Sequence, residues 1–366
     1  MADGFSASSR HFLGAAMLLV LPIVARGSSY YVDSNLGEDA RNGTSVSSAW
    51  KSLHKVNTTH LAAGDRVLLI RGGVWSGQLD IKGSGTEADR IYIGDYGEIS
   101  KPKPTINGRG NVTAAVLVEN GSDYVTVENL AVTNFDGKDI FDGVEGERSG
   151  IQVGAWGGSI SHVRILNNDV YYVEGFSNHP TVGPPRGTHL DAKTHSQYTV
   201  GAILIHPAQY DDVAIDGNIV HDCTGTGIFP YAFKSSTHLL VQNNTIENVG
   251  SDGIEILNSA APVVQYNRCI HAGNNSGARD RVAGELGHNG LAVCGMWAFA
   301  SSDVLFQHNY CEGTRQIKYD GEAWDFDNGL SGTCVYQYNF SRDNEGGFLL
   351  SNEETRPNYR RIARFC

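Results

Sequence analysis

From about residue 124 onward, apolar and polar positions follow one eight-residue pattern that occurs seven times. Apolar residues hold the first and third places in nearly every copy, and the copies begin at residues 125, 163, 213, 239, 262, 304 and 334. The sixth place is Leu130 in the first copy and asparagine in the others: Asn168, Asn218, Asn244, Asn267, Asn309 and Asn339. Alternation over three to five residues, bounded by Gly and Asn, predicts a short β-strand that ends in a turn.

A shorter apolar phrase, usually opening with Gly, begins at residues 150, 201, 227, 253, 290 and 347. From Asn218 to Asn244 is 26 residues and from Asn244 to Asn267 is 23, which suits a coil of two or three short strands. Such small coils bury apolar side chains only when they stack. We therefore predict an all-β, right-handed parallel β-helix over residues 124–366. Its asparagine column should adopt a left-handed backbone and hydrogen-bond from coil to coil.

Residues 28–123 fit the entry coils of the same solenoid. They read as a strand, a Gly/Asn-rich loop, a short helix around residues 52–61 and a strand in the phrase "GDRVLL". This order resembles the first coils of secreted pectin-lyase-like β-helix proteins, which act on polysaccharides. The resemblance implies a single-stranded right-handed parallel β-helix with a short N-terminal helix.

The N-terminus predicts export. Arg10 and His11 precede an apolar run over residues 12–25, and small residues follow it, which is the pattern of a secretory signal peptide over residues 1–27. A short membrane anchor is the alternative. We expect a secreted protein, extracellular or periplasmic in a bacterium, with no membrane segment in the mature chain. The net charge of -12 argues against a nucleic-acid partner.

An acidic stretch, "YDGEAWDFDNG" at residues 319–329, carries candidate chemistry. Trp324 and Phe326 should point into the coil, so that Asp325 and Asp327 face outward with Glu322 at the entry of the strand. Aligning the Gly phrases puts Asp252 level with Glu322 and Glu255 level with Asp325. Each pair is two coils apart, roughly 9 to 10 Å, and the coil that carries His288 lies between.

Paired carboxyl groups suit glycoside hydrolysis. In inverting glycosidases two carboxyl groups lie roughly 6.5 to 9.5 Å apart, and clustering raises the pKa of one so that it stays protonated. The phrases "SDGIEI", "GHNG" and "RQIK" also resemble, in order, motifs of polygalacturonases. That resemblance implies an acid or base at Asp252, a positioning group at His288, and substrate-carboxylate binding by Arg315 and Lys318. The adjacent Asp-Asp pair of that family is missing, and Glu322, Asp325 and Asp327 could replace it.

The resulting prediction is a secreted glycoside hydrolase that degrades an acidic, uronate-containing polysaccharide without a cofactor. The predicted catalytic residues are Asp252, His288, Glu322, Asp325 and Asp327, and the predicted substrate-binding residues are Glu255, Arg315 and Lys318.

Two alternatives remain open. In a polysaccharide lyase, Glu322, Asp325 and Asp327 would bind Ca²⁺, and Arg315 or Lys318 would act as the base. In a non-catalytic adhesin or glycan-binding protein, the acidic strand would only be solvated. The final segment begins another coil and stops, so we expect a truncated, uncapped end that is open to end-to-end association.

Overall fold

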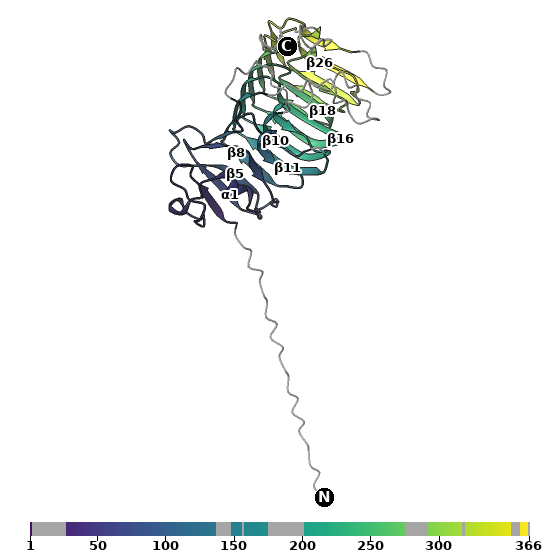
Figure 1. Cartoon of the computed structure of the whole chain (residues 1–366). Coiled ribbons are helices and arrows are strands. Elements are labelled where there is room, and N and C mark those ends of the chain that lie inside the picture. The colour runs from purple at the N-terminus through teal and green to yellow at the C-terminus, as the bar shows by residue number, and fades with distance from the viewer. Residues whose placement is uncertain are drawn as a thin grey trace.

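The structure, a computed structural model, describes residue 1 and residues 27–136, 148–155, 157–174, 201–274, 292–316, 319–352 and 359–364. The chain winds from its purple N-terminal coils to its yellow C-terminal coils as one stack (Figure 1). Most of the predicted signal peptide lies outside the described residues. Within the described part, no helix has the length and apolar character needed to cross a membrane.

The N-terminal part holds the helical elements, the 3-10 turn η1 (Val46–Ser48) and the helix α1 (Leu53–Asn57). Ser52 caps α1, because its hydroxyl accepts a hydrogen bond from the backbone N–H of Lys55 at 3.3 Å. Leu53 and Val56 turn their side chains into the main core. The predicted short helix is therefore confirmed, with five residues.

In the described residues, three parallel stacks of strands, called here the first, second and third sheet, form the walls of the solenoid. The first two join through the long strand β16 (Thr226–Gln242) into one 19-stranded sheet. The first sheet carries the candidate site, and its strands pair in the order β4 (Leu79–Ile81), β7 (Ala114–Val118), β10 (Ser149–Val153), β13 (Gly201–Ile205), the first half of β16 (Thr226–Gln242), β18 (Ile254–Ala260), β22 (Met296–Phe299), β26 (Glu322–Phe326) and β29 (Gly347–Ser351).

From residue 125 onward, the second sheet is formed by the repeated eight-residue phrase, one copy of which lies in the second half of β16. Its strands are β1 (Ser29–Val32), β2 (Arg66–Ile70), β5 (Ile91–Tyr96), β8 (Val125–Glu128), β11 (Ser159–Leu166), β14 (Gln209–Asp216), β16, β19 (Val263–Gln265), β23 (Leu305–Gln307), β27 (Thr333–Gln337) and β30 (Arg360–Arg364).

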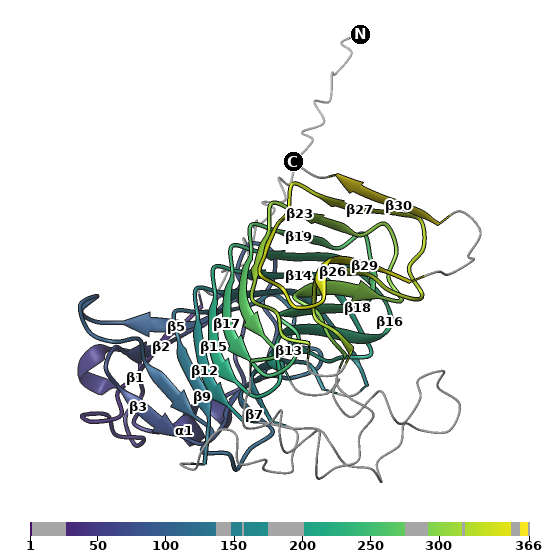
Figure 2. The same cartoon turned by 90° about the horizontal axis from the view of Figure 1, so that it is seen from above.

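The third sheet closes each coil. It contains β3 (Val74–Ser76), β6 (Thr105–Asn107), β9 (Ala131–Asn134), β12 (Asp169–Val173), β15 (Ile219–Cys223), β17 (Thr245–Val249), β20 (Arg268–Ala272), β24 (Tyr310–Glu312) and β28 (Phe340–Arg342). A separate parallel pair joins β21 (Ala292–Val293) to β25 (Tyr319–Asp320). Figure 2 shows the coils side by side along the stack. The predicted parallel β-helix is confirmed.

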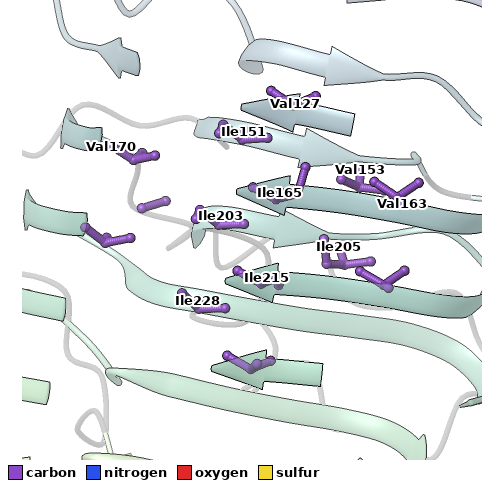
Figure 3. Close-up of a cluster of buried hydrophobic side chains, with 14 of the residues drawn as sticks. Val127, Ile151, Val153, Val163, Ile165, Val170, Ile203, Ile205, Ile215 and Ile228 are labelled. Carbon is purple, nitrogen blue, oxygen red and sulfur yellow. The ribbon is translucent and has the colours of Figure 1, made fainter. Parts of the chain in front are cut away.

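The core consists of like residues stacked from coil to coil. Ile151, Ile203 and Ile228 occupy one level of the first sheet on successive strands and are completely buried. Figure 3 shows this column beside Val163, Ile165 and Ile215 of the second sheet. Because each coil contributes only a few apolar side chains, burial depends on the coils above and below it.

The register predicted for the long phrase is confirmed, and that of the short phrase is confirmed only in part. Val163 pairs with Val213 and Val213 with Leu239, as aligned from the sequence. In the short phrase, Ile254 pairs with Met296, so that Gly253 lies level with Gly295 and not with Gly290. A side chain at Gly295 would collide with the Sγ of Cys311, because a Cβ there would lie 2.1 Å from it.

The predicted asparagine column is a hydrogen-bonded ladder. The side-chain oxygen of Asn218 accepts from the backbone N–H of Asn168 at 2.9 Å, and the same bond repeats from Asn218 to Asn244 and along to Asn339. The predicted left-handed conformation falls one residue earlier, for example at Asn167 (φ 52°) and Asn243 (φ 54°). Each ladder asparagine is therefore free to point inward while the preceding residue makes the turn.

Because of the ion pairs that His221 forms in the third sheet, we expect the stability of the folded protein to depend on pH. Its ring nitrogens lie 2.8 Å from Asp222 and 3.3 Å from Asp169. The hydrogen bond to Asp169, with help from Asp222, raises the His221 pKa to about 9. A raised pKa adds stability that is complete below the unfolded value near 6.5 and is lost as pH rises through the folded value.

We therefore expect His221→Gln to lower the free energy of unfolding by about 1 kcal/mol at pH 6, since the ring is partly exposed and solvent screens the pairs. Denaturant titrations of both proteins between pH 6 and 10 measure the difference, which should shrink above pH 9. The matched control is His238→Gln, because that ring is 76% exposed. If the two proteins differed in free energy of unfolding by the same amount at every pH, the charge of His221 would not be the cause.

Candidate active site

The strand β26 presents the predicted carboxylates outward. Trp324 and Phe326 are 1% and 2% exposed and belong to the core, so Asp325 between them faces away from it, as predicted. Although Asp325 faces away from the core, it is shielded from solvent, because only 3% of the residue is exposed. Asp327 is half-buried, and the amide of Asn352 donates to its Oδ1 at 2.6 Å.

The strand register confirms both predicted pairs of acids. Glu255 pairs with Trp297 and Trp297 with Asp325, so the two acids are level and two strands apart, roughly 9 to 10 Å between Cα atoms. By the same register Asp252 and Glu322 are level, with Cys294 between them. The intervening coil thus contributes Cys294 and Trp297, which corrects the predicted neighbours. His288 lies outside the described residues.

Asp252 is held by a set of donors. Its Oδ1 accepts from the backbone N–H of Cys294 and from the indole N–H of Trp297, both at 2.8 Å, and Ser251 contacts Oδ2 at 2.9 Å. The side chain is 1% exposed. Burial outweighs these hydrogen bonds and raises the Asp252 pKa to about 6. Asp252 is therefore a fixed, mainly ionised carboxylate at neutral pH.

Asp325 has the opposite protonation state. Burial, followed by the charges of Asp327, Asp320 and Glu322, raises the Asp325 pKa to about 8. Its Oδ1 is buried, and none of the described residues forms a hydrogen bond with it. A protonated carboxylic acid beside ionised carboxylates is the arrangement that supports general acid catalysis near neutral pH.

Glu255 is the most deeply buried acid of the group. It is 0% exposed, and neither carboxyl oxygen has a hydrogen-bond partner within the described part of the chain. Burial and the charges of Asp252 and Asp327 raise its pKa well above the ordinary value. The prediction that Glu255 faces outward is confirmed by its place level with Asp325, and its substrate contact stays a prediction.

Arg315 pairs with a carboxylate outside this group of acids. Its guanidinium forms an ion pair with Glu345 at 2.6 Å, and 45% of the side chain is exposed. In the described part of the chain, no lysine or arginine pairs with Asp252, Glu255 or Asp325. Lys318 lies outside the described residues. Arg315 is therefore already paired with Glu345 from the next coil, and its predicted contact with a uronate stays a prediction.

A cluster of aromatic side chains that the sequence pattern did not indicate lies beside the acids. Phe229 and Tyr231 of β16 are buried outside the main core, with ring centres 5.5 Å apart, and Phe233 follows Tyr231 at 5.0 Å. Leu204 and Leu257 complete this outward cluster. Aromatic residues at every second place of "GIFPYAF" were the available signal, because period-two spacing puts all three on one face. Sugars commonly bind where aromatic faces and hydrogen-bonding groups meet.

The calcium site of the lyase alternative is not assembled in the described chain. Among those residues, no group of three or more His, Cys, Asp or Glu side chains is arranged to hold a metal ion. Glu322 and Asp325 lie on β26, and Asp327 follows the end of that strand.

Comparison with known proteins gives two related examples. The chain is 27% identical to a lacto-N-biosidase of Bifidobacterium longum over 92% of this chain and 26% of that protein. It also resembles the crystal structure of a GH136 lacto-N-biosidase from Eubacterium ramulus, with 26% identity, a TM-score of 0.69, and coverage of 89% of this chain and 58% of that one. The chain thus spans about a quarter and somewhat over half of these relatives.

A more distant likeness, to a pectate lyase, has 13% identity and a TM-score of 0.50 and shows the fold alone. A family model described as "Right handed beta helix region" matches residues 105–309 and 201–360. Together with the observed coils, this match covers well over half of the chain, which belongs to the right-handed β-helix family.

Proposed function

We propose that this chain is the catalytic β-helix of a glycoside hydrolase that cleaves lacto-N-bioside linkages in neutral glycans. The observation that carries the proposal is Asp325, an outward-facing acid that is only 3% exposed and whose pKa is raised to about 8, next to the hydrogen-bonded Asp252 with a pKa of about 6. The similarity to lacto-N-biosidases over about nine-tenths of the chain supports the substrate class.

The charge of the site argues for a neutral sugar, which corrects the predicted uronate. Asp252, Glu322, Asp325 and Asp327 share one region, and Arg315 is neutralised by Glu345. A uronate carboxylate entering such a site would be repelled, and no described cation offsets that repulsion. An uncharged glycan needs only hydrogen bonds and aromatic contacts, which this face of the first sheet provides.

The proposed mechanism divides the work between Asp325 on β26 and Asp327, which follows the end of that strand. Asp325 donates its proton to the glycosidic oxygen while the bond from that oxygen to the anomeric carbon breaks. Asp327 is the partner whose carboxylate attacks the anomeric carbon or deprotonates the attacking water. Asp252 stays fixed by Cys294 and Trp297 and keeps negative charge near the developing oxocarbenium ion.

The first experiment is an incubation of the purified protein with p-nitrophenyl β-lacto-N-bioside and, separately, with polygalacturonate. We expect release of nitrophenol and the free disaccharide from the first substrate and no reaction with the second. An ultraviolet-absorbing unsaturated product from polygalacturonate would instead support the lyase alternative. Binding of the disaccharide without cleavage would support the glycan-binding alternative.

A further inference from the structure

Glu255 occupies a position in the first sheet whose neighbours on both adjacent strands are large aromatic residues. It lies level with Phe229 on one neighbouring strand and with Trp297 on the other. Leu204 continues the same outward column beyond Phe229. Phe229 is 0% exposed and Trp297 is 6% exposed, so the carboxyl group is set between two buried aromatic residues.

The carboxyl group of Glu255 has no hydrogen-bond partner among the residues that the structure describes. Both of its oxygens are buried there, whereas Asp252 accepts three hydrogen bonds. Leaving a buried polar group unpaired costs roughly 1 to 3 kcal/mol, more when it is charged. A leucine or methionine would avoid this cost, so the acid points to a ligand that completes its hydrogen bonds.

The neighbours of Glu255 indicate what kind of ligand that is. Tyr231 is level with Leu257, two residues after Glu255, so its ring lies on the same outward face as the carboxyl group. Burial, followed by the charge of Glu255, raises the pKa of Tyr231 to about 12. Rings beside a hydrogen-bonding group match a sugar, which has an apolar face and polar edges. Glu255 and Asp325 are two strands apart, roughly 9 to 10 Å, a separation comparable to the length of a disaccharide.

We propose that Glu255 is a substrate-binding residue that hydrogen-bonds to a hydroxyl or amide N–H group of a neutral sugar unit, whose apolar face packs against Phe229, Tyr231 and Trp297. This subsite holds the sugar at one end of a disaccharide whose other end reaches Asp325. The inference rests on the proposed function and adds a specificity-determining contact to it.

The test compares Glu255→Met and Glu255→Gln with the wild-type protein. Calorimetric titration with free lacto-N-biose should show at least about a tenfold weaker Kd for Glu255→Met, because the sugar then loses its partner in a buried site. Glu255→Gln should retain more affinity, since an amide still offers a donor and an acceptor. Kinetics on the aryl lacto-N-bioside should place the loss in KM more than in kcat.

Thermal unfolding separates this role from a structural one. We expect Glu255→Met to raise Tm, because it removes an unpaired buried acid, while it weakens binding. Glu247→Met is the matched control, since Glu247 is exposed on β17 in the third sheet and should alter neither Kd nor kcat.

The possible failures are distinct. An unchanged Kd in Glu255→Met, a lower Tm with normal binding, or a loss confined to kcat would each overturn the subsite. If the wild-type protein binds the disaccharide through Glu255 but cleaves no lacto-N-bioside, the proposed function fails and the subsite stands. If wild-type protein cleaves the substrate and both Glu255 variants match it, only the subsite fails.

Discussion

Replacing Asp325 with asparagine should lower kcat by about 10²- to 10⁴-fold on a lacto-N-bioside whose leaving group is a sugar, the range for loss of a general acid. The loss should be much smaller on the p-nitrophenyl glycoside, because nitrophenolate departs without being protonated. Steady-state kinetics of both substrates measure the ratio. The amide is close to the acid in shape, so the effect reports the missing proton and not a cavity.

Asp327→Asn serves as the comparison variant. It removes the proposed ionised partner, so both substrates should lose activity to a similar extent. Equal losses on the two substrates in Asp325→Asn would contradict the acid role and favour an exchange of roles between the two residues.

Protonation of Asp325 also sets the expected pH profile. Activity should fall as pH rises above about 8, where the proton is lost. Because the folded pKa is raised above the unfolded value near 3.9, the folded state binds this proton more tightly, and stability declines as pH rises from 4 to 8. Asp325→Asn should flatten that decline, measured as Tm against pH.

Asn244→Ala should lower the free energy of unfolding by about 2 to 4 kcal/mol, because it leaves several buried polar groups unpaired. Asn244 accepts from the backbone and amide of Asn218 at 2.9 and 3.0 Å, and it donates to the carbonyl of Ile215 at 2.9 Å and to Asn267 at 2.9 Å. Its side chain is 1% exposed, so water cannot replace these partners. Urea unfolding followed by circular dichroism measures the change.

Asn243→Gly is the matched control for this variant. Asn243 is exposed with φ 54°, and the equivalent place one coil earlier is already Gly217. Glycine adopts that conformation readily, so the substitution should cost little. A similar loss of stability in both variants would show that the turn, and not the ladder, holds the coils together.

The sequence predicted the coils well because repetition made their register visible. Val163, Val213 and Leu239 align in sequence and in the structure, since each needs the same inward place. The short phrase offered little besides a glycine, and Gly290 opens the apolar phrase "GLAV", whereas the structure places Gly295 level with Gly253.

The outward orientation of the site residues could be predicted from the sequence, but their burial and their ion-pair partners could not. Asp325 and Glu255 face outward as alternation requires, yet both are buried, and periodicity carries no information about what covers an outward residue. Arg315 looked available for a substrate because its partner, Glu345, is 30 residues away in the sequence. The aromatic cluster was read as ordinary strand sequence, since period two alone does not separate the core face from a binding face.

The asparagine ladder connects coils of unequal length. Its successive members are separated by 50, 26, 23, 42 and 30 residues, yet each makes the same bond to the next. The ladder therefore aligns successive coils of the solenoid, whatever the number of residues between its asparagines. Segments between strands can lengthen, shorten or change composition during evolution without changing the alignment of the coils. A family built in this way can acquire new substrates by editing its loops while the coil that aligns Glu255 with Asp325 stays unchanged.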